Sequence, residues 1–329
     1  MKLILSEKTD LSTNKVMSWL NYSGCQVIRY NGEERSLLNV DMELKNLKKS
    51  FVSHNSIILL GGDLDSIWFR RPYNIADDFY KLADLDFDSI VPQIEFEKRI
   101  KQHYTSLKSF IFLNLSIRQL GSYLKTGVNK LDTLLKADQC GLEIPESIVS
   151  NSQNSVVDFL KKHSKIICKP IAEGIRYVPD DTDYWISNKT ILIENEEEIS
   201  KQFDVSLFQE CLNKKYEIRI FYLDGDFYGA CIFSQSNEKT MVDFRNYDYD
   251  KPNRIVPYEL DNETKSKLKK LMMLLELNTG SIDLVKTKDG RIVFLEVNPV
   301  GQYGFISENC NYNLDWEIAK YLIGNDEEK

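Results

Sequence analysis

Two carboxylates and one amide within residues 280–299 form the pattern with the clearest chemistry in this sequence. Asp289-Gly290 is a strong signal for a two-residue β-hairpin loop with a type I′ turn. With that loop, Asp283 is predicted to lie directly opposite Glu296, with the two Cβ atoms about 5 Å apart. Asn298 falls on the same strand face, because side chains alternate along a strand. The opposite face is apolar and is predicted to face a core: Ile282, Leu284, Val293, Leu295 and Val297.

Two carboxylates directly opposite each other repel and destabilise a hairpin, and a divalent cation would remove that penalty. Two carboxylates and an amide oxygen form an oxygen-only ligand set, which suits Mg²⁺ held partly by substrate phosphates. The alternative is a solvated strand face that carries two acids by chance. The spacing alone leaves both interpretations open.

Composition narrows the class of protein. The 329 residues correspond to about two domains at roughly 150 residues each. The chain has 42 Lys and Arg against 50 Asp and Glu, so it lacks the basic charge of a general binder of nucleic acid or anionic membranes. No apolar run approaches the ~18 residues of a membrane span, and the apolar start is too short for a secretory signal. We expect a cytoplasmic protein with no nucleic-acid or membrane partner.

Cysteine and histidine usage excludes further chemistry. The six cysteines form no CxxC pattern and are expected to be reduced thiols, and the three histidines form no HExxH. If the chain is an enzyme, carboxylates, lysines and arginines are expected to carry its chemistry. Neither of the familiar glycine-rich phosphate loops is present. Any bound phosphates would therefore need side chains such as lysine, which act as point charges.

The elements that must position these residues follow an α/β (α+β) pattern. The first third alternates strands and a helix, as in an open α/β domain, with a buried parallel strand at 57–60. Its expected strands are 2–6, 26–29, 57–60 and 88–91, its helix is 11–20, and 95–124 is mainly helical. The pattern changes near residue 128, and the later expected strands are 166–170, 206–209, 217–223, 227–233, 281–286 and 291–297. The later expected helices are 129–139, 194–202, 263–275 and 313–322.

A second hairpin signal, Asp224-Gly225, ends a strand that places Glu217 and Arg219 on one face. Arginine suits bidentate binding of a carboxylate, so Arg219 is a candidate for contact with substrate. The alternative for Arg219 is a surface ion pair with Glu217, which stabilises little. Arg245, beside Asp243, is a similar candidate that could instead hold a loop in place.

Trp68, Arg70 and Arg71 combine an aromatic ring with two charges. They could bind a peptide. We favour the alternative, in which the tryptophan packs between domains and the arginines are solvated.

Several motifs resemble those of a known family. Asn129-Lys130-Leu131, Cys168-Lys169-Pro170 and Phe208-Gln209-Glu210, followed by the carboxylate hairpin, resemble the ATP-grasp ligases. More specific stretches resemble the peptide maturases of grasp-with-spasm systems, a branch of the graspetide synthetases, over nearly the whole chain. These stretches are SIWFRRP (66–72), YEIRIFYLDGDFYGACIFSQS (216–236), DFRNY (243–247), KPNRIVPYEL (251–260), LNTGSIDLV (277–285), FLEVNPVGQYG (294–304) and CNYNL (310–314).

The resemblance implies a role for each matching position. The nucleotide set would be Lys130 and Lys169 at the ATP phosphates, Glu210 at the adenine amino group, Cys211 and Leu212 at the adenine through their backbone, and Glu217 at the ribose. The metal set would be Asp283, Glu296 and Asn298 around Mg²⁺. Arg219, Arg245 and Lys169 would face the reacting groups. One departure is that residues 172–176 contain only Gly174, so the groups that cover the γ-phosphate stay open.

The resemblance also implies an activity and a domain organisation. An ATP-grasp fold would comprise a pre-ATP-grasp α/β domain (1–125), a central subdomain (126–205) and a C-terminal subdomain (206–329). The chain would bind a precursor peptide with leader and core segments, act as a homodimer, and use ATP and Mg²⁺ to join core Asp or Glu side chains to Thr or Ser (ester) or Lys (amide). The alternatives are an ATP-grasp ligase that joins separate amino acids or peptides, and a non-catalytic ATP-binding regulatory protein.

Overall fold

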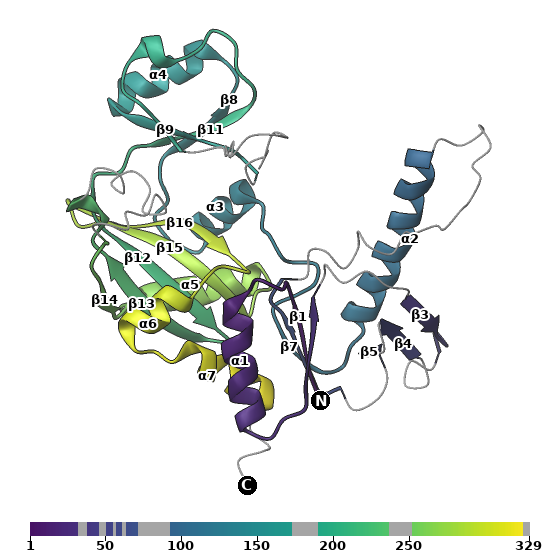
Figure 1. The fold of residues 1–329 in the computed structure, drawn as a ribbon. Coiled ribbons are helices and arrows are strands. Elements are labelled where there is room, and N and C mark those ends of the chain that lie inside the picture. Colours follow the sequence, from purple (N-terminus) through teal and green to yellow (C-terminus); the bar gives the residue numbers. More distant parts are fainter. Residues whose placement is uncertain are drawn as a thin grey trace.

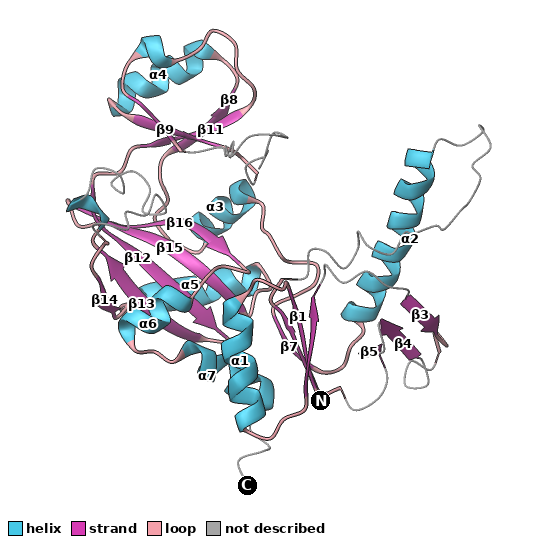
Figure 2. Cartoon of the chain, viewed as in Figure 1, coloured by secondary structure: helices cyan, strands magenta, loops and turns pink. Residues whose placement is uncertain are grey.

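The computed structural model describes residues 1–31, 38–45, 51–54, 57–60, 64–71, 93–172, 190–236 and 252–324. These residues form several separate β-sheets with helices packed against them (Figures 1 and 2). The predicted α/β (α+β) class is confirmed. None of the described helices combines the length and the apolar character needed to cross a membrane.

The N-terminal sheet is parallel and has the strand order β2-β1-β6-β7. Its elements are β1 (Lys2–Ser6), α1 (Leu11–Tyr22), β2 (Val27–Asn31), β6 (Ser66–Phe69) and β7 (Arg118–Leu120). Helix α1 begins where the side chain of Asp10 accepts a hydrogen bond from the Thr13 backbone N–H at 3.0 Å. The α/β interpretation of this region is therefore correct in type.

One expectation for the first third is wrong. The run 57–60 forms β5 (Ile57–Leu60), which is not in the parallel sheet but pairs antiparallel with β4 (Phe51–His54), and β4 pairs with β3 (Leu38–Asp41). The segment 95–124 is mainly helical, as expected, since α2 spans Gln93–Leu113, and β7 follows it. The β7 residue Leu120 is fully buried beside β6, so sheet pairing replaces the helical pattern. The expected strand at 88–91 lies outside the described residues.

A four-stranded antiparallel sheet with the order β10-β9-β11-β8 follows. It comprises β8 (Ser147–Ser150), β9 (Ile166–Lys169), β10 (Ile191–Ile193) and β11 (Ser206–Glu210), and α4 (Gln153–His163) packs on it through Val156, Phe159 and Leu160. The helix expected at 194–202 is only the short 3₁₀ helix η3 (Glu196–Glu198). The Glu198 carboxylate accepts from the backbone N–H groups of Glu194 and Asn195, and Ile199 is extended, so the turn does not continue.

The C-terminal sheet has five antiparallel strands in the order β14-β13-β12-β15-β16. The strands are β12 (Lys214–Leu223), β13 (Asp226–Ile232), β14 (Ile255–Tyr258), β15 (Thr279–Thr287) and β16 (Ile292–Asn298), with the 3₁₀ helix η4 (Ser234–Ser236) after β13. The loop between β12 and β13 is the predicted type I′ turn, because Asp224 and Gly225 both have positive φ, at 46° and 112°.

Each face of this sheet packs against helices. α3 (Lys130–Gln139) and α5 (Asn262–Leu274) cover one face through a core that includes Leu134, Leu268 and Met272. α6 (Gly304–Cys310), α7 (Leu314–Ile323) and α1 pack near the other face, where Phe221 and Leu223 join a core shared with the N-terminal sheet. Figure 1 shows α1 and α7 between the two sheets. Only part of this second face is apolar, and the rest carries the charged residues described next.

Candidate active site

The carboxylate hairpin has the predicted pairing but not the predicted turn. Asp283 lies directly opposite Glu296, as expected. The turn is one residue longer, because the Thr287 N–H donates to the Arg291 carbonyl at 3.0 Å and the Gly290 N–H donates to the Thr287 carbonyl at 3.2 Å. Gly290 has φ 98°, but Asp289 does not have positive φ, so the type I′ prediction is wrong at this turn.

A register shift between Asp283 and Leu284 compensates for the longer turn. Leu284 pairs with Phe294, and Phe294 takes the core position predicted for Leu295, which is only half-buried. Ile282, Leu284 and Val297 are in the core facing α3 and α5, as predicted, whereas the buried Val293 lies outside that cluster. The bulge restores the register just before the carboxylate pair, so the pairing of Asp283 with Glu296 survives.

Three neighbouring strands bring the predicted charged residues to one face of the sheet. Arg219 on β12 pairs directly with Asp283 on β15, and Asp283 pairs with Glu296 on β16. Asn298 follows on the same face, opposite Ser281. The side chains of Phe221 and Leu223 continue this face into the buried core near α6 and α7. Phe305 of α6 borders the charged half of this face, with the Arg219 Cζ 6.0 Å from the centroid of its ring.

Arg219 binds Asp283 and not Glu217, which corrects the ion pair considered from the sequence. Its Nη1 donates to Asp283 Oδ2 at 2.6 Å, and the two side chains are only 11% and 13% exposed. The Arg219 Nε is buried and has no hydrogen-bond partner within the described parts of the chain. A buried donor without an acceptor is costly. An oxygen of a bound ligand would satisfy it.

Glu217 is buried and has its own partners. Its Oε1 accepts from Lys214 Nζ at 3.0 Å and from Ser234 Oγ at 3.1 Å. Burial raises the pKa of this carboxyl, because desolvation disfavours the charged form more than Lys214 and Ser234 stabilise it. Nothing in the sequence indicated a role for Ser234, which lies in η4, and only the nearness of Lys214 to Glu217 along β12 could have indicated one for Lys214.

Glu210, Cys211 and Leu212 lie where the chain passes from β11 to β12. Glu210 Oε1 accepts from the Glu146 N–H at 3.1 Å, and its Oε2 lies 3.5 Å from Arg291 Nη2. The Cys211 N–H donates to the Lys165 carbonyl at 3.1 Å, and burial raises the pKa of its thiol. The Leu212 side chain is half-buried. This connection is thus fixed to β8, β9 and the hairpin turn by hydrogen bonds.

Lys130 and Lys169, both predicted to contact the ATP phosphates, lie near the same end of β9. Lys130 is the first residue of α3, which Asn129 caps by accepting from the Leu131 N–H at 3.0 Å. Lys130 Nζ donates to the Pro170 carbonyl at 3.4 Å, and Pro170 directly follows Lys169, the last residue of β9. The structure therefore brings Lys130 to the end of the strand that carries Lys169. Arg245 and Gly174 lie outside the described residues.

Trp68 packs in the core as favoured from the sequence, but the expectation of solvated arginines is wrong. Trp68 and Arg70 are 3% and 4% exposed. Arg70 and Arg71 donate to backbone carbonyls of the turn that follows Asn298. The SIWFRRP motif therefore contacts the turn that follows the carboxylate hairpin. The spacing of residues in the sequence did not predict this contact.

The donor set fits a hard cation. Asp283, Glu296 and Asn298 offer only oxygen atoms on adjacent strands, and Asn298 is exposed. Within the described ranges, no group of three or more His, Cys, Asp or Glu side chains could hold a metal ion. Two carboxylates and an amide leave coordination positions for ligand oxygens, as Mg²⁺ sites with phosphates require.

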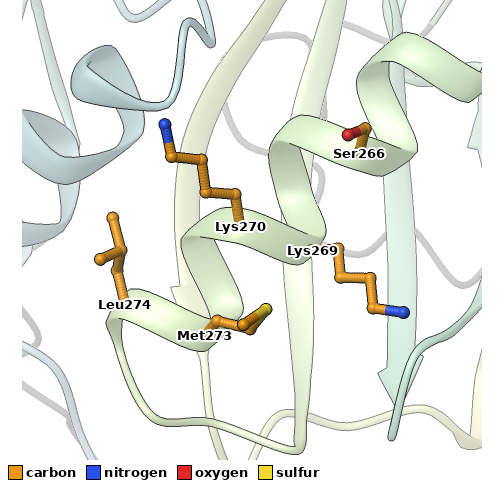
Figure 3. A pocket seen from close by; sticks show the side chains of 5 residues that line it. All are labelled: Ser266, Lys269, Lys270, Met273 and Leu274. Carbon is orange, nitrogen blue, oxygen red and sulfur yellow. The ribbon is translucent and has the colours of Figure 1, made fainter.

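A surface pocket elsewhere is separate from these residues. Ser266, Lys269, Lys270, Met273 and Leu274 of α5 line it (Figure 3). Helix α5 packs on the sheet face opposite the carboxylates, since Ile282 and Leu284 point to α5 while Asp283 does not. The pocket therefore does not belong to the candidate active site.

Solved structures with a similar fold cover nearly the whole chain. The macrocyclase MdnC bound with the precursor peptide MdnA, from Microcystis aeruginosa MRC, has a TM-score of 0.76 and 24% identity over 98% of this chain and 99% of that chain. A Chryseobacterium gregarium RiPP-associated ATP-grasp ligase, in complex with ADP and a leader and core peptide, has a TM-score of 0.76 and 21% identity over 98% and 94%. The ATP-grasp ligase PsnB, with minimal precursor, Mg and ADP, has a TM-score of 0.72 and 17% identity over 98% and 96%.

These likenesses establish the fold. The chain has the ATP-grasp fold, as the motifs predicted. Within that fold its similarity to a macrocyclase and to two ATP-grasp ligases extends over nearly the whole chain. No protein-family model matches the sequence, and no curated protein matches it either.

Proposed function

We propose that this chain is an ATP-dependent ligase that macrocyclises a ribosomally made precursor peptide. The observation that carries the proposal is the single sheet face on which Arg219, Asp283, Glu296 and Asn298 converge. It combines oxygen ligands for a metal with a guanidinium whose buried Nε has no hydrogen-bond partner among the described residues. The MdnC structure holds a precursor peptide, and the C. gregarium structure holds ADP with a leader and core peptide, which supports the same class of substrate here.

ATP would lie between the β9–β11 sheet and the C-terminal sheet. We assign Lys130 and Lys169 to the phosphates, because Lys130 contacts the end of the strand that Lys169 closes. Cys211 and Leu212 would meet the adenine through their backbone, and Glu210 would lie at its amino group. Glu217 would bind the ribose, and the hydrogen bonds that fix it support a precise position for that contact.

Asp283, Glu296 and Asn298 would hold Mg²⁺, and a PsnB structure that contains Mg and ADP supports the choice of this metal. When bound, the metal would neutralise charge on the phosphate oxygens during phosphoryl transfer. Arg219 would orient an anionic oxygen through its guanidinium, as such groups do for carboxylates and phosphates. Arg245 and Lys169 are proposed to add positive charge nearby.

The chemistry needs no nucleophile from the protein. The γ-phosphoryl group of ATP would pass to an Asp or Glu side chain of the core peptide, giving an acyl phosphate and ADP. A Thr or Ser hydroxyl, or a Lys amine, of the same peptide would then attack the acyl carbon and expel phosphate. The product is an ester or amide ring with loss of one water overall. Positioning and charge neutralisation are sufficient for such a reaction.

We also propose a cytoplasmic homodimer with three segments, 1–125, 126–205 and 206–329. Strand β11 is hydrogen-bonded to β8 and β9, so the connection between the last two segments would lie after Glu210. Helix α3 packs with the C-terminal sheet, so it would move with that sheet.

Incubation of the purified protein with a candidate precursor peptide, ATP and Mg²⁺ tests the function. Mass spectrometry is expected to show loss of one water per ring together with formation of ADP. ADP without dehydrated peptide would contradict macrocyclisation. Ligation of an added free amino acid would instead favour a ligase for separate substrates, and no ADP under any condition would favour a regulatory ATP-binding protein.

A further inference from the structure

A buried arginine directly after β6 of the N-terminal sheet donates hydrogen bonds to the turn that follows the candidate metal ligands. Arg70 Nη1 donates to the carbonyl of Val300 at 3.1 Å and to that of Gly301 at 2.9 Å. The neighbouring Arg71 Nη1 also donates to the Val300 carbonyl, at 2.7 Å. These bonds join positions that are far apart in the sequence. They leave the turn after Asn298 little freedom to move.

That turn is coupled directly to Asn298. The Val300 N–H donates to Asn298 Oδ1 at 3.0 Å, and the Gly301 N–H donates to the Asn298 carbonyl at 3.1 Å. The two residues whose carbonyls Arg70 holds are thus the same two whose N–H groups hold Asn298. An amide oxygen has two lone pairs, so Asn298 Oδ1 can keep this bond and still bind a cation.

Arg70 is itself fixed from the opposite side. Its Nε donates to Asp10 Oδ2 at 2.9 Å, and Asp10 also caps α1 by accepting from the Thr13 N–H. Arg70 lies between the rings of Trp68 and Tyr303, with its Cζ 5.9 Å and 5.4 Å from their centroids. A planar guanidinium suits such a site, because its donors point in fixed directions.

We propose that Arg70 is a positioning residue that fixes Asn298 and the end of β16 for metal binding. This inference rests on the proposed function, since it concerns the same metal site. Arg70 acts through the backbone of Val300 and Gly301 and does not belong to the ligand set. Its loss is expected to weaken binding of the metal–nucleotide complex while the fold persists.

The test measures binding of Mn²⁺ in the presence of ADP by electron paramagnetic resonance, on the full chain and without peptide. Arg70→Met is expected to raise the dissociation constant for Mn²⁺ about 10- to 100-fold, the usual effect of losing a group that orients a metal ligand. Arg70→Lys keeps the charge beside Asp10 but cannot reach every acceptor, so we expect an intermediate value. It also serves as the second variant if Arg70→Met does not fold.

Lys2→Met is the matched control. Lys2 is also buried and positively charged, and it lies in β1 of the N-terminal sheet. Its Nζ lies 2.9 Å from Asp65 Oδ1 and donates to the Ile323 carbonyl at 3.3 Å, away from the turn. Both methionine variants are expected to melt at lower temperature than the natural chain. Only the Arg70 variants are expected to lose Mn²⁺ affinity.

The outcomes separate this inference from the proposed function. If the natural chain binds Mn²⁺ with ADP and the folded Arg70 variants bind it equally well, the positioning role is wrong and the proposed function stands. Equal weakening by Lys2→Met would also overturn the positioning role, because the loss would follow stability alone. If the natural chain does not bind Mn²⁺ with ADP, the proposed metal site fails and this inference fails with it.

Discussion

The guanidinium of Arg219 donates to the carboxylate of Asp283 across two neighbouring strands. Asp283 is one of the two carboxylates that suggested a divalent cation, and its negative charge is therefore already balanced by Arg219. Glu217 is similarly paired with Lys214.

Replacement of Arg219 by methionine removes the partner of Asp283 in a site that is largely shielded from water. We expect the free energy of unfolding of the ligand-free protein to fall by about 3 kcal/mol, because a buried carboxylate is left unpaired. We expect ADP formation to fall about 10²- to 10³-fold, since a preorganised donor is lost. Urea unfolding and a coupled ADP assay measure the two effects. Unchanged turnover would show that Arg219 only pairs with Asp283.

Glu296→Gln keeps the size of the side chain and removes the charge. We expect turnover to fall by about 100-fold or more, because several kcal/mol of charge stabilisation through the metal would be lost. Far-UV circular dichroism is expected to be unchanged. Glu259→Gln is the control, since the Glu259 side chain is 83% exposed and pairs with the nearby Lys265. Normal ADP formation by Glu296→Gln would contradict the metal assignment.

The carboxylate hairpin shows which features of the site could be predicted from the sequence and which could not. Alternation and the Asp-Gly signal predicted the pairing of Asp283 with Glu296, and the structure has it. The same Asp-Gly signal predicted the wrong turn at Asp289, although it predicted the right one at Asp224. The longer turn shifts the pairing register by one residue. The bulge between Asp283 and Leu284 shifts it back. Local sequence preferences do not specify such compensation, because it depends on packing of Phe294 against Leu284.

Long-range pairing explains the other differences. The run 57–60 has the composition of a buried parallel strand, but its partner is β4 rather than β1. Nothing local in SIWFRRP indicates that Arg70 meets a carbonyl 230 residues later in the chain. The ATP-grasp fold was predictable because its motifs recur in order, whereas the contacts between segments depend on the assembled sheets.

Gly301→Ala tests the close approach of the turn to β15. A Cβ at this position would lie 2.5 Å from both Cβ and Oγ of Ser281. Because Ser281 is fully buried opposite Asn298, it cannot move away, so we expect the turn to be displaced. Mn²⁺ affinity in the presence of ADP is expected to fall at least about tenfold.

Gly304→Ala provides the control for that variant, because a Cβ there meets nothing within 4 Å. Gly304 is the first residue of α6, so alanine is expected to leave stability unchanged or to raise it by up to about 1 kcal/mol. Equal effects of the two substitutions on Mn²⁺ affinity would show that the contact of Gly301 with Ser281 is not the cause.

Glu217 gives a prediction about pH. Burial raises its pKa in the folded state above the ordinary 4.5. Below that ordinary pKa, both the folded and the unfolded chain hold the proton, and the stabilising contribution is complete. As pH rises, the unfolded chain releases the proton first, so the free energy of unfolding falls until the pH passes the raised folded pKa. Glu217→Gln cannot titrate and lacks this fall.

Urea unfolding of the natural chain and of Glu217→Gln between pH 4 and pH 7.5 measures this difference. The free energy of unfolding of the natural chain, minus that of Glu217→Gln, is expected to decrease as pH rises. Ser234→Ala removes a hydrogen bond that lowers the pKa of Glu217, so the decrease is expected to extend to higher pH in that variant. A difference that stays level or increases with pH would mean that Lys214 holds Glu217 ionised in the folded protein, against the effect of burial.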